Sequence, residues 1–297
     1  MCFETFLTYL FVLVDDWISA ARPLEAKRRP GRPPLISDGE VLTLAILSQW
    51  PRFRSERDFW RFANAHLREY FPNLLGQSQL NRRIRALEPE LRALQRHLSA
   101  SLADGTEVYR VLDTTLVPAI VRARAHRKGL FAGQAAFGRN VSKTEWVYGF
   151  KVALSGRPEG VVTAFGLAPA NADERPIGEF LIRSDGHDAF LADKGFSSLG
   201  WEWRWLEEYG VLVAATPQAN ARRAWPEGAC RWAAGKRQIV EGVIWQLKDL
   251  FGLERHRAKT LSGLLTRLAA KVAAYTCGQV INAALGRPLR RLASLLV

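Results

Sequence analysis

Three acidic residues have the chemistry and the setting of a metal-dependent catalytic site. Asp113 follows the apolar, β-branched run Val108–Leu112, and Asp193 follows a second strand-like run, Ala189–Ala192. Ligand sites in open α/β sheets gather at the carboxyl ends of strands, so we expect these two carboxylates to converge. Glu241 stands on a predicted helix whose apolar residues form one stripe, and it would supply the third carboxylate.

The reaction that these carboxylates could support follows from their mutual repulsion, which a divalent metal would relieve. The five histidines lack HxxxH or HxH spacing, and the three cysteines form no CxxC pair. The oxygen donors therefore favour Mg²⁺ or Mn²⁺ over Zn²⁺. Two such ions can activate a nucleophile and stabilise the leaving oxygen in phosphodiester chemistry. Taken singly, each acid is better explained as a turn former or a solvated helix residue.

The charge of the chain favours the catalytic interpretation because it indicates a polyanionic partner. The chain carries 42 Lys and Arg against 29 Asp and Glu, a net charge of +13 with a pI of about 10.1. A folded protein this basic usually binds a polyanion such as nucleic acid. Residues 1–106 hold 15 basic and 12 acidic residues, whereas residues 107–297 hold 27 and 17. We therefore expect polyanion binding and chemistry to share a surface.

A run of basic residues follows Asp113 and is opposed by one acid, Glu145. It suits phosphate contacts that give affinity without sequence readout, although a solvated loop would carry the same charges. Its members are Arg122, Arg124, Arg127, Lys128, Arg139, Lys143 and Lys151.

Residues 1–104 are predicted to be all-helical and to form a DNA-binding or dimerisation domain. Helices are expected over residues 1–22, 41–50, 55–70 and 77–102. The second and third begin with a Ser cap that has an acidic residue three positions later, a typical helix start. The best boundary between this part and residues 105–297 is Asp104–Gly105, where the pattern changes.

Two features of the helical part could contact DNA. The helices over residues 55–70 and 77–102 could form a helix-turn-helix with Arg82, Arg83 and Arg85 facing DNA, or a helical scaffold. Arg32 lies in Gly31-Arg32-Pro33, which matches the core of a minor-groove AT-hook, although an exposed linker is the simpler interpretation.

Residues 105–297 are predicted to form an α/β domain with a mixed five-stranded sheet. Three strands come first, and helices then alternate with two more, so the sheet is not purely parallel. Strands are expected over residues 108–112, 148–154, 161–167, 189–192 and 211–215, and helices over 173–183, 198–209, 236–250 and 261–285.

The motifs resemble those of the DDE transposases of bacterial insertion sequences. Asp113–Thr115 resembles the family's first motif, and Asp193–Phe196 resembles the second, which is Asp, any residue, Gly and an aromatic residue. Arg237, Glu241 and Lys248 match the third motif at the family's spacing. The segments around residues 31–42 and 251–275 also resemble the opening and closing parts of such proteins, so the resemblance covers most of the chain.

The resemblance implies a ribonuclease H-like catalytic domain in which Asp113, Asp193 and Glu241 bind two Mg²⁺ or Mn²⁺ ions. It implies a transposase that binds terminal inverted repeats, cuts a DNA strand and joins the exposed 3′-OH to target DNA, with Arg237 and Lys248 holding the DNA end. Its partner would be double-stranded DNA, on which it would assemble as a homodimer. The alternatives are a metal-dependent nuclease of the same fold without strand transfer, or a non-catalytic, transposase-derived DNA-binding protein.

The sequence also predicts a cytoplasmic, nucleoid-associated protein without a membrane partner. The apolar stretch Leu7–Val14 is too short to span a bilayer, and no basic region precedes it. The three cysteines lie far apart, which suggests no disulfide framework.

Overall fold

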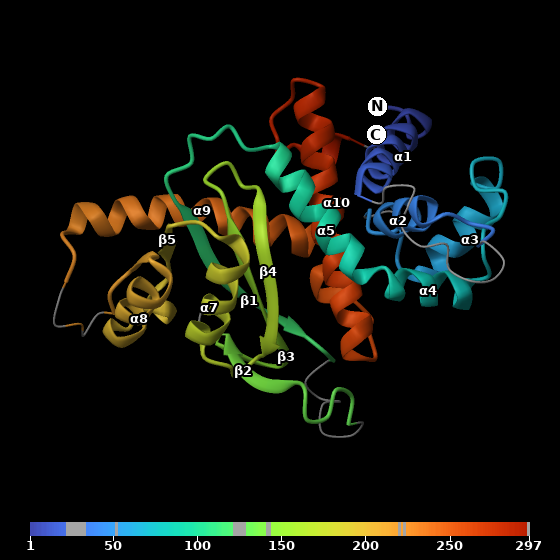
Figure 1. Cartoon of the computed structure of the whole chain (residues 1–297). Coiled ribbons are helices and arrows are strands. Elements are labelled where there is room, and N and C mark those ends of the chain that lie inside the picture. The colour runs from blue at the N-terminus through green and yellow to red at the C-terminus, as the bar shows by residue number, and fades with distance from the viewer. Residues whose placement is uncertain are drawn as a thin grey trace. The chain divides into compact units, whose positions relative to one another are not determined.

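The computed structural model describes residues 1–21, 34–50, 53–120, 129–140, 144–218, 221 and 224–295 (Figure 1). The chain forms two compact units. One contains residues 1–98, 249–257 and 262–297, and the other contains residues 99–248 and 258–261. The predicted boundary at residues 104 and 105, as a division into domains, stays a prediction. None of the helices in the described ranges is long and apolar enough to cross a membrane.

The first part of the chain is helical, as predicted. Its helices are α1 (Phe3–Ala21), α2 (Asp38–Leu47), α3 (Glu56–His66), α4 (Gln77–Ala86) and α5 (Glu88–Ser101). The capping box before α2 is confirmed: the Ser37 hydroxyl accepts from the Glu40 N–H (3.1 Å), and the Glu40 carboxylate accepts from the Ser37 N–H (2.7 Å). Ser55 caps α3 by accepting from the Asp58 N–H (3.1 Å).

The helix predicted over residues 77–102 is wrong as one element, because α4 ends at Ala86 and α5 begins at Glu88. Pro89 explains the break: proline has no N–H to donate and its ring clashes with the carbonyl four residues earlier, but it fits the first turn of a new helix. Helix α3 also ends at His66, short of the predicted Tyr70. Residues 67–76 therefore connect α3 to α4, a longer connection than the three- or four-residue turn of a helix-turn-helix.

Helix α10 (Leu261–Ala284) is buried along most of its length. Its Lys271 donates hydrogen bonds to the Gln49 side-chain oxygen (3.0 Å) and to the Phe251 carbonyl. Burial lowers the pKa of Lys271 to about 7, because the charged form loses water that these neutral oxygens only partly replace.

The second unit is built on one mixed sheet, which confirms the predicted ribonuclease H-like fold. Within the described residues the sheet has six strands: β1 (Arg110–Pro118), β2 (Ala136–Asn140), β3 (Glu145–Gly156), β4 (Val162–Pro169), β5 (Ala189–Ala192) and β6 (Leu212–Ala215). Strand β3 is antiparallel to β1, β2 and β4, and β5 is parallel to both β1 and β6. The strand order is β2-β3-β1-β5-β6, and β4 pairs with β3.

The short strand β2 was not predicted from the sequence. It pairs with one end of β3 and has Gly138 at its centre, and an interior glycine weakens the strand signal. The structure gives a reason for that glycine: a Cβ at position 138 would overlap the backbone carbonyl of Ala170. The glycine therefore allows β2 to lie against the end of β4.

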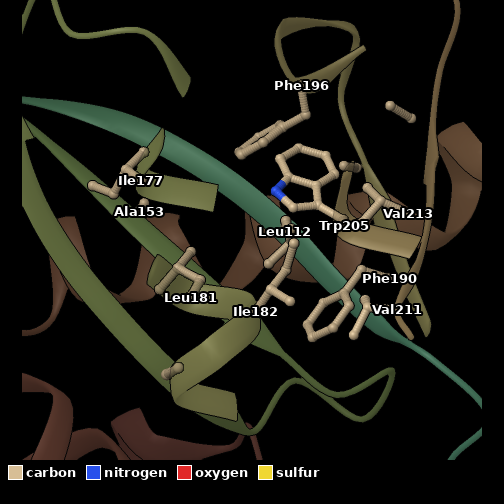
Figure 2. Packing of buried hydrophobic residues seen from close by; sticks show 13 residues of the cluster. Leu112, Ala153, Ile177, Leu181, Ile182, Phe190, Phe196, Trp205, Val211 and Val213 are labelled. Atoms are coloured by element: carbon tan, nitrogen blue, oxygen red, sulfur yellow. The ribbon is translucent and has the colours of Figure 1, made fainter. Parts of the chain in front are cut away.

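Helices cover both faces of this sheet. Helix α7 (Glu174–Asp185) and helix α8 (Leu199–Tyr209) share a core with one face, and α9 (Glu227–Asp249) crosses the other face (Figure 1). Figure 2 shows Trp205 of α8 enclosed among side chains of α7 and the strands. The buried residues of this core include Leu112, Ala153, Ile177, Leu181, Ile182, Phe190, Phe196, Trp205, Val211 and Val213.

Candidate active site

The two aspartates stand side by side on neighbouring parallel strands. Strands β1 and β5 pair in register up to Leu112 and Ala192, and the next residues are Asp113 and Asp193. Both aspartates line one cavity. The strand register thus brings together two carboxylates that are 80 positions apart in the sequence.

Asp113 lies inside its strand, so the predicted strand end at Leu112 is wrong. Strand β1 continues to Pro118 because it keeps pairing with β3 as far as Gly149. The residues after Asp113 include Thr114, Thr115 and Val117, whose β-branched side chains favour a strand and could have revealed the continuation. The residues before and after Asp113 are consequently both paired with β3.

Asp113 has the most strongly perturbed carboxyl group of the candidate site. Burial raises the pKa of Asp113 to about 7, because the charged form is costly away from water. The Thr114 N–H, which donates to its carboxylate (2.7 Å), and the positive charge of Arg237 oppose that rise in the pKa. The negative charges of Asp193 and Glu241 add to it.

Arg237 of α9 lies between the second and third predicted carboxylates, Asp193 and Glu241, and pairs with both. Its guanidinium lies 3.0 Å from Asp193 Oδ1 and 3.8 Å from Glu241 Oε1, and its side chain is 14% exposed. Glu241 is 57% exposed and lies four residues further along the helix. The sequence had suggested carboxylates without a neutralising partner, whereas the structure provides one in Arg237. Its expected contact with a DNA end stays a prediction.

The two aspartates line a cavity of about 830 Å³ whose walls carry both acidic and basic side chains. Four basic residues line it, and a further carboxylate, Glu174, lies in the wall with Asp113 and Asp193. The basic residues are Arg139, Lys151, Lys194 and Lys248. A cavity with this lining could hold a phosphate-rich ligand beside the paired aspartates.

Sequence reasoning missed Glu174, the first residue of α7. Its Oε1 accepts from the Thr114 hydroxyl (2.8 Å) and from Lys151 Nζ (3.1 Å). Lys151, which was assigned to the basic run that follows Asp113, therefore pairs with an acid within the protein and also donates to the Ala172 carbonyl (2.8 Å). An acidic residue in the first turn of a helix is common, so its type alone gave no signal.

The residues that the structure describes contain no group of three His, Cys, Asp or Glu side chains arranged to hold a metal ion. Asp113 and Asp193 are adjacent, but Glu241 is turned toward Arg237. The two aspartates provide hard oxygen donors, and the buried charge of Asp113 would gain from a cation. Their chemistry thus fits Mg²⁺ or Mn²⁺.

The predicted DNA-binding residues of the helical unit differ in their surroundings. Arg82 and Arg85 are exposed on α4, whereas Arg83 forms an ion pair with Asp38 (2.5 Å). Several other predicted DNA contacts lie outside the described residues: Arg32, Arg122, Arg124, Arg127, Lys128 and Lys143.

The tryptophans of helices α8 and α9 differ in their burial and in their contacts. Trp205 is fully buried and Trp201 packs against it (ring centroids 5.7 Å apart), so both contribute to the core. Trp203 is exposed on the opposite side of α8. The helix predicted from residue 236 begins earlier: α9 starts at Glu227, directly after Pro226, so Trp232 is helical, and its ring lies near Tyr109.

Comparisons with known proteins identify a family. The sequence model of the family described as transposase DDE domain matches residues 103–261, more than half of the chain. The matched segment includes Asp113, Asp193 and Glu241. Neither a curated protein nor a solved structure gave a match.

Proposed function

The chain belongs to the transposase DDE-domain family, and we propose that it is a DNA transposase that acts on the ends of its own mobile element. The observation that carries the proposal is the strand register that sets Asp113 beside Asp193 in a cavity that four basic residues also line. Adjacent carboxylates suit metal-dependent phosphodiester chemistry, and basic side chains suit the DNA backbone.

Asp113, Asp193 and Glu241 would hold two Mg²⁺ or Mn²⁺ ions. When bound, such ions act as Lewis acids on the attacking and leaving oxygens of a phosphodiester. Asp113 would be the fixed donor, because the strand on either side of it is paired. Glu241 is more exposed than Asp193 (57% against 32%), and its side chain would turn from Arg237 toward the aspartates to bind with them.

The basic residues of the cavity would bind and orient DNA. Lys194 follows Asp193 directly, and Lys248 lies seven residues after Glu241 on α9. Contacts from these two lysines to phosphates on either side of the scissile bond would fix its direction relative to the aspartates. Arg237 would orient Asp193 and Glu241, and could meet DNA only beside them.

Two displacements at phosphorus would then follow. In the first, a water oxygen bonds to phosphorus at the transposon end while the bond to the 3′ oxygen breaks, and that oxygen leaves as a 3′-OH. In the second, this 3′ oxygen bonds to a target phosphorus and expels the target's own 3′ oxygen. Neither step forms a covalent bond to the protein. A homodimer assembled on DNA would place one copy at each terminal inverted repeat.

The test uses the full chain, Mg²⁺ and duplexes carrying the inverted repeats that bracket its reading frame. We expect nicking at the repeat end and joining of that 3′ end to a target plasmid. Nicking without joining would support a metal-dependent nuclease instead. Binding of the repeats with neither reaction would support a non-catalytic DNA-binding protein, and both results would overturn the proposal.

A further inference from the structure

We propose that Glu174 is a positioning residue that fixes the backbone carrying Asp113 relative to the backbone carrying Asp193. The proposal rests on the proposed function in so far as it takes these two aspartates as the metal-binding pair. Glu174 touches the chain just after each aspartate: Thr114 after Asp113, and the turn at Gly195 after Asp193.

The contact with β1 is a hydrogen bond from a side chain next to Asp113. The Thr114 hydroxyl donates to Glu174 Oε1 (2.8 Å), and the Thr114 N–H donates to the Asp113 carboxylate (2.7 Å). One residue therefore links Glu174 to Asp113. A shift of Thr114 would move the donor that orients the Asp113 carboxylate.

The contact with the second aspartate is a close approach to backbone. The other oxygen of Glu174, Oε2, lies 1.7 Å from where a Cβ at position 195 would be, so a Cβ there would displace the Glu174 carboxylate. Gly195 is two residues after Asp193, inside the short 3₁₀ turn Lys194–Phe196 whose N-cap is Asp193. The carboxylate of Glu174 therefore packs directly against the turn that aims Asp193.

Glu174 lines the same cavity as the two aspartates, but it meets β1 from the α7 side of the sheet, through Thr114. Side chains alternate along a strand. Leu112 belongs to the core shared with α7 and α8, so Thr114 shares that face. Asp113 points the other way, toward the charges of Arg237 and Glu241 on α9.

Lys151 holds Glu174 in place. Its ammonium lies 3.1 Å from Glu174 Oε1 and donates to the Ala172 carbonyl just before α7, and the two side chains are 13% and 22% exposed. A partly buried ion pair of this kind is stiffer than a surface pair, because water competes less for either partner. Strand β3 thus anchors Glu174, and Glu174 anchors the two backbones that present the aspartates.

The test measures Mn²⁺ binding to the full chain by electron paramagnetic resonance, without DNA, beside single-turnover DNA cleavage. Outer-shell partners of metal ligands typically contribute about 10- to 100-fold to metal affinity. We expect Glu174→Ala to raise the Mn²⁺ dissociation constant by about that factor and to slow cleavage similarly. Glu174→Gln should lose much less, because its amide oxygen can still accept from Thr114.

Two further variants separate positioning from general stability. Glu179→Ala is the matched control, since Glu179 lies on the same helix and pairs with Arg204 (3.1 Å), with its side chain 14% exposed. It should lower the melting temperature but keep the Mn²⁺ affinity. Gly195→Ala should weaken Mn²⁺ binding like Glu174→Ala, and the double variant Gly195→Ala/Glu174→Ala should be no worse than the poorer single variant.

Unchanged Mn²⁺ affinity in Glu174→Ala, or an equal loss in Glu179→Ala, would overturn the proposal. If Glu174→Ala does not fold, Gly195→Ala becomes the test, and a wild-type Mn²⁺ affinity in that variant would overturn the proposal. A wild-type chain that does not bind Mn²⁺ would overturn it too, because there would be no pair to position. A chain that binds Mn²⁺ in a Glu174-dependent way but does not cut DNA would refute the proposed function alone.

Discussion

Two ionisable side chains, one in each unit, have pKa values moved to about 7 from opposite directions. Burial raises the pKa of Asp113 from an ordinary 3.8, and burial lowers the pKa of Lys271 from an ordinary 10.5. The physical cause is the same for both, since the charged form loses its water. Their pKa values alone would make both candidates for a functional site.

Their surroundings separate them. Asp113 lines a cavity and has charged neighbours of both signs, which include Asp193 and Arg237. Lys271 also has charges of both signs near it, on Arg267 and Glu56, but it is enclosed on α10, where its ammonium donates to the neutral oxygens of Gln49 and Phe251. The comparison teaches that burial moves a pKa, whereas access to a cavity decides whether the group can meet a substrate.

The largest expected effect contrasts the two residues directly. Asp113→Asn keeps the shape of the side chain but removes a charged oxygen donor, so single-turnover cleavage should fall by on the order of 10³-fold or more. Binding of the DNA ends should change little, because the basic contacts dominate affinity. Lys271→Met should keep the wild-type rate per folded molecule. Equal rate losses in both variants would break the comparison.

Arg237 offers the next test, because it connects the carboxylates rather than supplying one. Arg237→Ala should release Asp193 and Glu241, and misplacement of about 1 Å can cost about 10²-fold in rate. We expect cleavage to fall by about that factor while end binding at fixed salt changes far less. Melting temperature is measured alongside. A lower melting temperature with normal turnover would mean that Arg237 only stabilises the helix.

The buried lysine should make folding depend on pH. Between about pH 7 and pH 10.5 the unfolded chain holds a proton on Lys271 that the folded chain lacks, so stability should rise with pH in this window. From pH 7 to pH 9 the gain should be about 2 kcal/mol, and Lys271→Met should lose it. Urea denaturation of both proteins at the two pH values measures the difference, and parallel pH dependence would refute a depressed pKa.

The smallest effect concerns the exposed arginines of α4. Arg82→Ala/Arg85→Ala should weaken DNA binding uniformly and reduce the log–log salt slope by about 0.9 for each phosphate that the protein no longer neutralises. Arg83→Ala is the matched control, since Arg83 is paired with Asp38 and should affect stability instead. A salt slope that stays the same in the double variant would limit DNA binding to the α/β unit.

Local signals in the sequence predicted the fold well. The Ser37 capping box and the strand Ala189–Ala192 depend on neighbouring residues, and both appear as expected. The break between α4 and α5 was missed although Pro89 marked it. Strand β2 was missed because Gly138 hides its pattern, and its stability comes from pairing with β3 rather than from its own residues.

The candidate site was only partly predictable for a related reason. Asp113 and Asp193 could be found because each ends or interrupts an apolar run. Glu174 could not, because its partners Thr114 and Lys151 are 60 and 23 residues away, and no local pattern records such a contact. Lys151 looked like a DNA contact for the same reason: its charge is visible in the sequence, but the acid that pairs with it is not.

The register of β1 with β5 has a consequence for how this chain can tolerate changes in length. Successive side chains of a strand point to opposite faces, so one residue inserted ahead of Asp113 within β1 would turn its carboxylate to the α7 side. The same insertion in the turn between β3 and β4 would leave both aspartates in place. Lineages derived from this protein should therefore gain and lose residues in the connections while the strand segments that lead to the two aspartates keep a fixed length.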